Sequence, residues 1–402
     1  MSQSQPAGAT LPIVDIDSHW TEPPDLWVSR APAALRAAAP RVESGAEGRE
    51  QWVAADGLVL APVGYCAVRR DGSKAVGRVT LDTFAEVHPG AVRADARLAW
   101  LDQHGIAAQV MYPNVLGFTG SLVMQIRDAD LRRFCVTAYN DAAADLKRES
   151  GGRLLPQAVL PIWDVAAATA ELARSHDQLG LHGIVLPDAP EVWGLPTLSD
   201  LSWEPLWCEA EARGVPVNFH IGGGGPMGAI WAGMSEGATI AALSSLADTS
   251  NIRCLVNLIF SGLLDRHPSL RFVSVESGLG WIPFVLELAE YQFDENGVTS
   301  LKLRPREYFR RQIYASWWFE SDLGPALGAL GQDNILFETD FPHPTCLYPE
   351  VRGRIAQSLA GQPVRVQRKL LYETAAAIYG VPGELIDSAR AMWNSRAAPA
   401  AG

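Results

Sequence analysis

The chain has 402 residues, of which 48% are hydrophobic, and a formal net charge of −12 at pH 7. A chain of this length and composition can bury a large core within one globular domain. Its negative charge, with no basic block to offset it, disfavours a general role on nucleic acid or on an anionic membrane. Small molecules or proteins are therefore the expected partners.

Five cysteines are scattered along the chain and form no C-x-x-C pair, so they indicate neither a disulfide framework nor a thiolate zinc site. The N-terminal MSQSQPAGATLP lacks a basic segment followed by an apolar run. No stretch has the ~18 consecutive apolar residues of a membrane span. We therefore expect a cytoplasmic protein.

Short apolar runs recur along the chain, separated by helix-like segments. The predicted strands are IVDIDSH (13–19), AAQVMYP (107–113), LLPQAVLP (154–161), GIVLP (183–187), VPVNFHI (215–221), RFVSVES (271–277), QIYASWWF (312–319) and NILFETD (334–340). Helical patterns cover 93–105, 130–151, 164–180 and 201–214, and several end in glycine, a common C-cap signal. Strands alternating with helices in this way predict an α/β fold, a parallel sheet closed into a (β/α)8 TIM barrel.

Two segments depart from the alternation. Residues 40–90 are β-rich with D-G turn signals, which predicts a small hairpin inserted after the first strand. Residues 385–402 end in RAAPAAG and predict a helix with a loose tail. Because neither a solenoid repeat nor a low-complexity linker occurs, we expect residues 1–402 to form a single domain.

Polar residues alternate in the first predicted strand, VDIDSHW. Because alternate residues of a strand share a face, Asp15, Asp17 and His19 point the same way. The apolar residues around them indicate burial, and buried carboxylates beside a histidine need a partner charge. The motif alone fits a metal site and a salt-bridged structural site equally well.

Other candidate ligands lie where strands end, which is where TIM barrels place their catalytic groups. With Asp17 and His19 they are His220, Glu276, Asp340 and His343, the last two in ETDFPHP. Nitrogen and oxygen ligands from several strands would thus point into the same end of the barrel, which favours the metal site. The remaining histidines, His88, His104, His176, His182 and His267, are interpreted as structural or solvated.

The carboxylate count favours two metal ions over one. One divalent ion facing Asp17, Glu276 and Asp340 leaves the site about one charge negative, which would repel an anionic substrate, whereas two ions leave about one positive charge. Imidazoles and carboxylates without a thiolate suit iron, manganese or zinc. Asp15, deeper in the strand, is expected to orient the ligands rather than bind metal.

Five segments resemble the amidohydrolase-related TIM-barrel family that includes aminocarboxymuconate-semialdehyde decarboxylase and γ-resorcylate decarboxylase. They are VDIDSHWTEPPDLW, LDQHGIAAQVMYP, VNFHIGGG, FSGLLDRHPSLRFVSVESGLGWIPF and ILFETDFPHP. The resemblance implies metal ligands at Asp17, His19, His220 and Asp340. The chain has Glu276 where those decarboxylases use a histidine for proton transfer, which argues against decarboxylation.

Glu276 and His343 together resemble a branch of TIM-barrel non-haem diiron monooxygenases, typified by the diterpenoid C-5 hydroxylase of platensimycin and platencin biosynthesis. This resemblance implies an oxidoreductase with two iron ions and dioxygen as co-substrate. The implied iron ligands are Asp17, His19, His220, Glu276, Asp340 and His343, with Glu276 and Asp340 catalytic. It further implies an external electron donor and hydroxylation of an unactivated C–H bond in a CoA-linked diterpenoid, polycyclic or acyl substrate of antibiotic biosynthesis.

Rival functions remain. One is a mononuclear zinc- or manganese-dependent hydrolase or decarboxylase, with Asp340 or Glu276 as the base. Another is a barrel that only binds a ligand, which is disfavoured because convergent carboxylates are hard to hold together without metals. Barrels of this size commonly form homodimers, but the sequence carries no interface signal.

Four tryptophans are candidates for packing a bulky substrate. Trp20, Trp281, Trp317 and Trp318 lie beside the ligand strands, although core packing is the more usual role of a tryptophan. The glycine run HIGGGGP (220–226) lacks the lysine of a P-loop, so it is interpreted as a close backbone approach or a mobile loop rather than a phosphate cradle.

Overall fold

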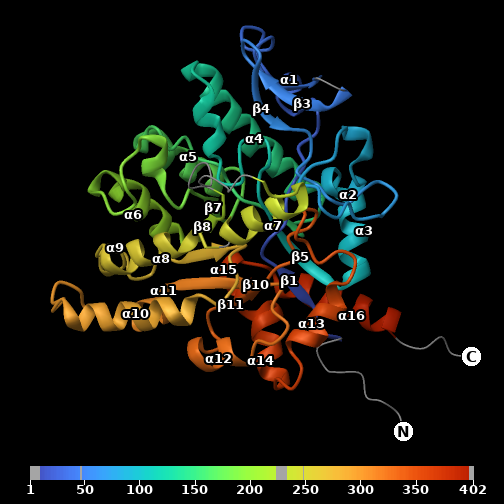
Figure 1. Ribbon diagram of the computed structural model, residues 1–402. Coiled ribbons are helices and arrows are strands. Elements are labelled where there is room, and N and C mark those ends of the chain that lie inside the picture. The colour runs from blue at the N-terminus through green and yellow to red at the C-terminus, as the bar shows by residue number, and fades with distance from the viewer. Residues whose placement is uncertain (1–9, 46–47, 223–232, 248, 398–402) are drawn as a thin grey trace, which may run out of the picture.

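The computed structural model describes residues 10–45, 48–222, 233–247 and 249–397, and its centre is a barrel of parallel strands surrounded by helices (Figure 1). The barrel strands are β1 (Ile13–Asp15), β5 (Ile106–Met111), β6 (Leu154–Pro156), β7 (Ile184–Val185), β8 (Val217–His220), β9 (Phe272–Val275), β10 (Ile313–Trp317) and β11 (Ile335–Phe337). They pair in two parallel sheets, β1-β5-β6 and β11-β10-β9-β8-β7.

Two junctions close these sheets into a ring. On one side a bridge between Ala158 and Ile184 joins the end of β6 to β7. On the other, the Ile16 N–H donates to the Phe337 carbonyl at 3.0 Å, and the His19 N–H donates to the Phe341 carbonyl at 2.8 Å. All the predicted strands are present, and the predicted TIM barrel is confirmed.

Some of the outer helices begin or end at residues that the capping rules indicate. The predicted helices correspond to α3 (Ala94–His104), α4 (Ala129–Glu149), α5 (Val165–Asp177) and α6 (Glu204–Arg213). The Asp128 carboxylate accepts from the Leu131 N–H at 2.8 Å and caps α4, while Gly105 ends α3 with a left-handed φ of 65°. Leu201–Trp203, which the sequence assigns to the start of α6, form a separate 3₁₀ turn.

The later helices complete the outer layer. They are α7 (Glu236–Ala247), α8 (Asn251–Phe260), α9 (Leu263–Arg266), α10 (Ile282–Glu295), α11 (Pro305–Gln312), α12 (Gly324–Leu330), α13 (Val351–Ser358), α14 (Val364–Arg368), α15 (Thr374–Tyr379) and α16 (Gly383–Ala397). Most of the predicted C-terminal tail is thus helical, and the rest of it, 398–402, lies outside the described residues. No helix among the described ranges is long and apolar enough to cross a membrane.

The β-rich insertion is a three-stranded antiparallel sheet, one strand more than the predicted hairpin. It comprises β2 (Arg41–Ser44), β3 (Glu50–Ala54) and β4 (Leu58–Pro62), and it stands at one end of the barrel (Figure 1). The segment after β4 packs on the loop that follows β11. There the Ala67 N–H donates to the Pro342 carbonyl at 2.8 Å, and the Tyr348 hydroxyl donates to the Gly72 carbonyl at 2.9 Å. The insertion therefore braces the loop that carries His343.

Candidate metal centre

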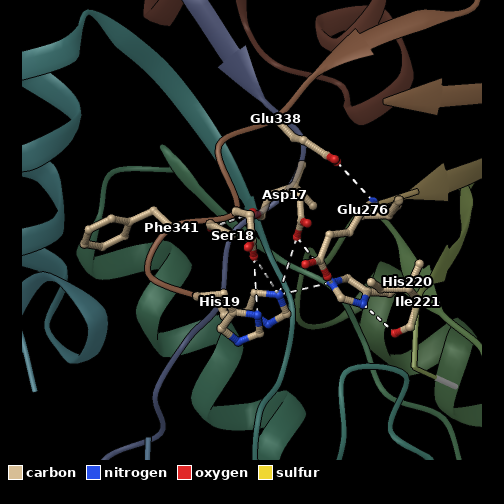
Figure 2. Close-up of polar contacts among 12 residues, drawn as sticks. Asp17, Ser18, His19, His220, Ile221, Glu276, Glu338 and Phe341 are labelled. Carbon is tan, nitrogen blue, oxygen red and sulfur yellow. Dashed lines mark hydrogen bonds and ion pairs between the residues drawn. The ribbon is translucent and has the colours of Figure 1, made fainter. Parts of the chain in front are cut away.

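All six predicted ligands meet at the carboxyl end of the barrel. Asp17 and His19 follow β1, His220 ends β8, Glu276 follows β9, and Asp340 and His343 follow β11. They form two groups whose ligand atoms lie within 4.8 Å of one another: Asp17, His19, His220 and Glu276, and then His19, Glu276, Asp340 and His343. Figure 2 shows the side chains of the first group pointing toward one another.

Short distances join the two groups. The Nε2 atoms of His19 and His220 are 3.0 Å apart. His19 Nε2 lies 3.7 Å from an Asp17 oxygen and 3.6 Å from an Asp340 oxygen, and His220 Nε2 lies 3.3 Å from Glu276 Oε2. These atoms surround a space of the size that one ion fills when its nitrogen and oxygen ligands lie at ~2 Å.

Hydrogen bonds fix how two of the imidazoles face the centre. His220 Nδ1 lies 2.8 Å from the Ile221 carbonyl, so it donates there and leaves Nε2 as a lone pair toward the ligands. His343 Nε2 lies 3.0 Å from Asn114 Oδ1, which turns Nδ1 toward Asp340 at 3.3 Å. Such outer contacts are the usual way in which a protein orients metal-binding histidines.

Buried oxygens without partners indicate that a cation belongs here. Asp17 and Asp340 are fully buried, and both Asp17 oxygens and Asp340 Oδ1 lack a hydrogen-bond partner among the described residues. An unpaired buried carboxylate is costly in free energy unless a cation or a proton neutralises it. Carboxylates with imidazoles and no thiolate fit a divalent ion such as manganese or zinc, so the residues present suit a metal centre.

Burial also shifts the acidities around the centre. It raises the pKa of Asp340 well above its usual range, and the charge of Asp17 raises it further. Burial lowers the pKa of His343 well below its usual range, with a further contribution from His220. Both shifts favour the uncharged forms of the two side chains.

Two of the ligands sit on strained backbone. Only three non-glycine residues in the described ranges have a positive φ, and two of them are Glu276 (53°) and Asp340 (56°). A left-handed conformation costs a residue with a Cβ about 1–2 kcal/mol. Strain of this kind persists where surrounding contacts enforce it, and it gathers at functional sites.

Asp15 has the contacts of an orienting residue. One of its carboxylate oxygens accepts from the Thr339 N–H at 2.9 Å and from the Asp17 N–H at 3.2 Å. The other accepts from Gln109 Nε2 at 2.7 Å and from the Thr339 hydroxyl. Asp15 thus links the chain at Asp17 to the residue before Asp340. Burial raises its pKa to about 7.

Several buried polar residues near the centre escape the sequence analysis. Arg97 is 1% exposed, donates to the His19 carbonyl at 2.6 Å and to Gln109 Oε1 at 2.7 Å, and covers the Phe341 ring. Glu22 accepts from the Asn114 N–H at 3.0 Å and so holds the loop that orients His343. Arg97 lies on a helix and Glu22 in a loop, so a search for polar residues at the ends of predicted strands finds neither.

The candidate substrate tryptophans lie close to the core. Trp20 and Trp317 belong to the hydrophobic core cluster, and the Trp20 indole donates to the Val92 carbonyl at 3.0 Å. Trp318 is buried, whereas Trp281 is partly buried and donates to the Ser277 carbonyl at 2.7 Å. Their contact with a substrate stays a prediction. Of the glycine run, Gly222 has a φ of 82°, and 223–226 lie outside the described residues.

Known proteins resemble this chain over most of its length. The family model described as amidohydrolase matches residues 15–381. A γ-resorcylate decarboxylase of Rhizobium sp. (strain MTP-10005) is 28% identical over 62% of this chain and 76% of its own length.

Solved structures share the fold. An amidohydrolase of Mycobacterium avium subsp. paratuberculosis K-10 superposes with a TM-score of 0.69 at 21% identity, covering 92% of this chain and 99% of that one. A dihydroxybenzoic acid decarboxylase of Polaromonas sp., solved with manganese and the inhibitor 2-nitroresorcinol, gives a TM-score of 0.57 at 16% identity, covering 93% and 99%.

The prediction of a non-haem diiron monooxygenase, and with it the oxidoreductase class, is wrong. The relatives are decarboxylases, and manganese is the metal in the Polaromonas structure. Iron, dioxygen, an electron donor and a CoA-linked substrate have no support. A count of formal charges takes every carboxylate as ionised, whereas burial raises the pKa of Asp340 well above its usual range. The expectation that Glu276 argues against decarboxylation has no support either, because the relatives are decarboxylases.

The family model runs from the first barrel strand to α15, past the last of the six ligand residues. The chain therefore belongs to the amidohydrolase family.

Proposed function

We propose that this protein is a divalent-metal-dependent, non-oxidative decarboxylase of a small hydroxylated aromatic carboxylic acid. The observation that carries the proposal is a buried metal-ligand group lying directly beside an Asp340–His343 pair that can hold one proton. The decarboxylase relatives and the amidohydrolase family support the reaction class.

The proposed ion is a single manganese or zinc held by Asp17, His19, His220 and Glu276. One imidazole nitrogen binds one ion, so His19 cannot complete both ligand groups at once, and Asp340 and His343 remain beside the ion. The two ligand carboxylates then balance the divalent charge, and the Asp340–His343 pair with its proton is neutral. An anionic substrate is therefore not repelled. When bound, the ion supplies Lewis-acid charge that binds and orients an anionic oxygen.

The Asp340–His343 pair is the proposed proton donor. In decarboxylation the ring carbon that carries the carboxylate accepts a proton, the bond to the carboxylate breaks, and its electron pair stays with the ring as carbon dioxide leaves. His343 Nδ1 lies 3.3 Å from Asp340 Oδ1, and Asn114 fixes the imidazole from its other side. Solvent returns the proton to the pair after turnover. The sequence predicts Glu276 and Asp340 both as ligands and as catalytic residues. In this proposal Glu276 is a ligand only, Asp340 is catalytic, and neither Asp340 nor His343 binds the single ion.

Aromatic side chains beside the histidines suit an aromatic substrate. The Phe118 ring lies 4.9 Å from His19, 5.3 Å from His220 and 4.8 Å from His343, and Tyr65 of the inserted segment packs edge-on against it at 5.2 Å. Phe118 and Tyr65 are partly exposed, whereas the three imidazoles are buried. A substrate ring approaching the ligands would therefore meet aromatic faces, which favour stacked or edge-on packing.

Anaerobic turnover tests the proposal. The manganese-loaded protein is incubated under argon with γ-resorcylate and related hydroxybenzoates, and carbon dioxide and the phenol product are measured. We expect turnover without dioxygen and about one manganese per chain. His176→Ala, which removes a histidine outside the centre, should retain activity. Absence of carbon dioxide release from every acid in the series, with metal bound, would refute the function.

A further inference from the structure

A further buried carboxyl group lies directly behind the ligands. Glu338 follows β11, two residues before Asp340, and its side chain is fully buried. Its Oε2 accepts a hydrogen bond from the backbone N–H of Glu276 at 3.2 Å, as Figure 2 shows. Its Oε1 has no hydrogen-bond partner among the residues that the structure describes.

This hydrogen bond falls at the strained point of the centre. Glu276 holds a φ of 53°, and its Oε2 lies 3.3 Å from His220 Nε2, so its backbone turn aims the carboxylate at the first ligand group. A residue with a Cβ keeps such a conformation only when its surroundings enforce it. The Glu338 carboxyl supplies one contact that does so, because it fixes the direction of the Glu276 N–H.

Packing alone does not explain a glutamate at position 338. An apolar residue would fill the same space without leaving an unpaired oxygen in the interior. The preceding β11 residues, Ile335, Leu336 and Phe337, are apolar and buried, so the carboxyl group directly follows a buried apolar run. A buried polar group that is only partly satisfied calls for a functional reason.

We propose that Glu338 is a positioning residue of the metal centre, which acts by holding the left-handed backbone of Glu276 so that the Glu276 carboxylate points at the ion. The inference rests on the metal centre of the proposed function and not on the reaction that the centre catalyses. Glu338 itself belongs to neither ligand group.

Manganese affinity tests this role without reference to turnover. Glu338→Met fills the volume but cannot accept the hydrogen bond, and Glu338→Ala is made as well, in case one of the two does not fold. Glu338→Gln keeps an acceptor oxygen. Loss of an outer contact to a ligand typically weakens metal affinity by about 10–100-fold, so we expect that loss in the Met or Ala variant and a change within about 3-fold in the Gln variant. The free manganese signal in electron paramagnetic resonance measures the affinities, and circular dichroism checks the fold.

A double-mutant cycle separates positioning from a general effect on the site. In a Glu276→Ala background, removal of Glu338 should change the affinity by less than about 2-fold, because the residue through which it acts is gone. Equal affinity of the wild type and the folded Met or Ala variant would overturn the inference. A Gln variant that binds manganese as weakly as the Met or Ala variant would also overturn it. So would a loss of about 10–100-fold in manganese affinity when Glu338 is removed in the Glu276→Ala background. If the wild type itself binds no manganese, the proposed function fails, which is a distinguishable result.

Discussion

Replacing Glu22 with glutamine should change how stability depends on pH. Glu22 is fully buried and accepts from the Asn114 and Val115 N–H groups at 3.0 and 3.2 Å, and burial raises its pKa from 4.5 to about 7. Between these values the unfolded chain has lost the proton that the folded chain keeps. The wild type should therefore lose unfolding free energy as the pH rises from about 4.5 to 7, by about 3 kcal/mol in total.

Glu22→Gln keeps an acceptor for both N–H groups but cannot titrate, so it should not show this loss. Urea unfolding of the metal-free proteins at about pH 4 and pH 8 measures the effect, with both values outside the window in which Glu22 exchanges its proton. Between about pH 4 and pH 8, the unfolding free energy of the wild type should fall by about 3 kcal/mol more than that of the variant. Glu149→Gln, at an exposed glutamate, is the control and should follow the wild type. Parallel stability profiles for wild type and Glu22→Gln would refute the idea that a neutral carboxyl group supports the Asn114 loop.

Further substitutions test the centre itself. His220→Ala should reduce bound manganese to below about a tenth of the wild-type content, measured by mass spectrometry of the metal, because the first ligand group loses a nitrogen; full occupancy would exclude His220 as a ligand. Asp340→Asn should retain manganese but lower kcat by about 10²–10⁴-fold, as expected for loss of a proton donor; loss of the metal instead would make Asp340 a ligand. Phe118→Ala should raise KM for an aromatic acid by about 10-fold with little change in kcat, since it removes a packing surface; an unchanged KM would place the substrate elsewhere. Asp15→Ala should weaken manganese binding by about 10–100-fold in a titration, and unaltered binding would count against its orienting role.

The barrel and the ligand cluster are readable from the sequence because both follow local rules. Apolar runs with period-two polar residues indicate strands, and Asp17, His220 and Asp340 lie where such runs stop. The supporting residues depend on tertiary contacts instead. Arg97 lies on α3 and reaches the His19 carbonyl, across a sequence separation that no local pattern encodes. Glu338 directly follows the apolar residues of ILFETD, as a strand-end candidate does, but the sequence does not show that its carboxyl group accepts from the Glu276 N–H.

The chemistry was less predictable than the geometry because acidity depends on burial. The sequence supplies the number of carboxylates, and a count of formal charges then favours two cations. That count leaves out burial, which raises the pKa of Asp340 well above its usual range and so favours its neutral form. Formal charges alone therefore do not decide between one ion and two. A ligand list therefore fixes where a metal binds more firmly than it fixes how many ions bind or which reaction follows.

The strain within the centre follows from where the carboxylates must point. Glu276 follows β9 and Asp340 follows β11, two strands of one parallel sheet, and successive residues of a strand alternate between the two faces of that sheet. A left-handed residue at the strand end breaks this alternation and turns the chain sharply, which can direct both carboxylates to one point. That conformation opposes the preference of each residue, so outside contacts must hold it. Thr345 donates to Glu276 Oε1 at 3.2 Å and to Asp340 Oδ2 at 2.5 Å, while Glu338 holds the Glu276 backbone. The rest of the barrel must therefore be stable enough to maintain this strained backbone, and a bound cation would offset part of its cost in free energy.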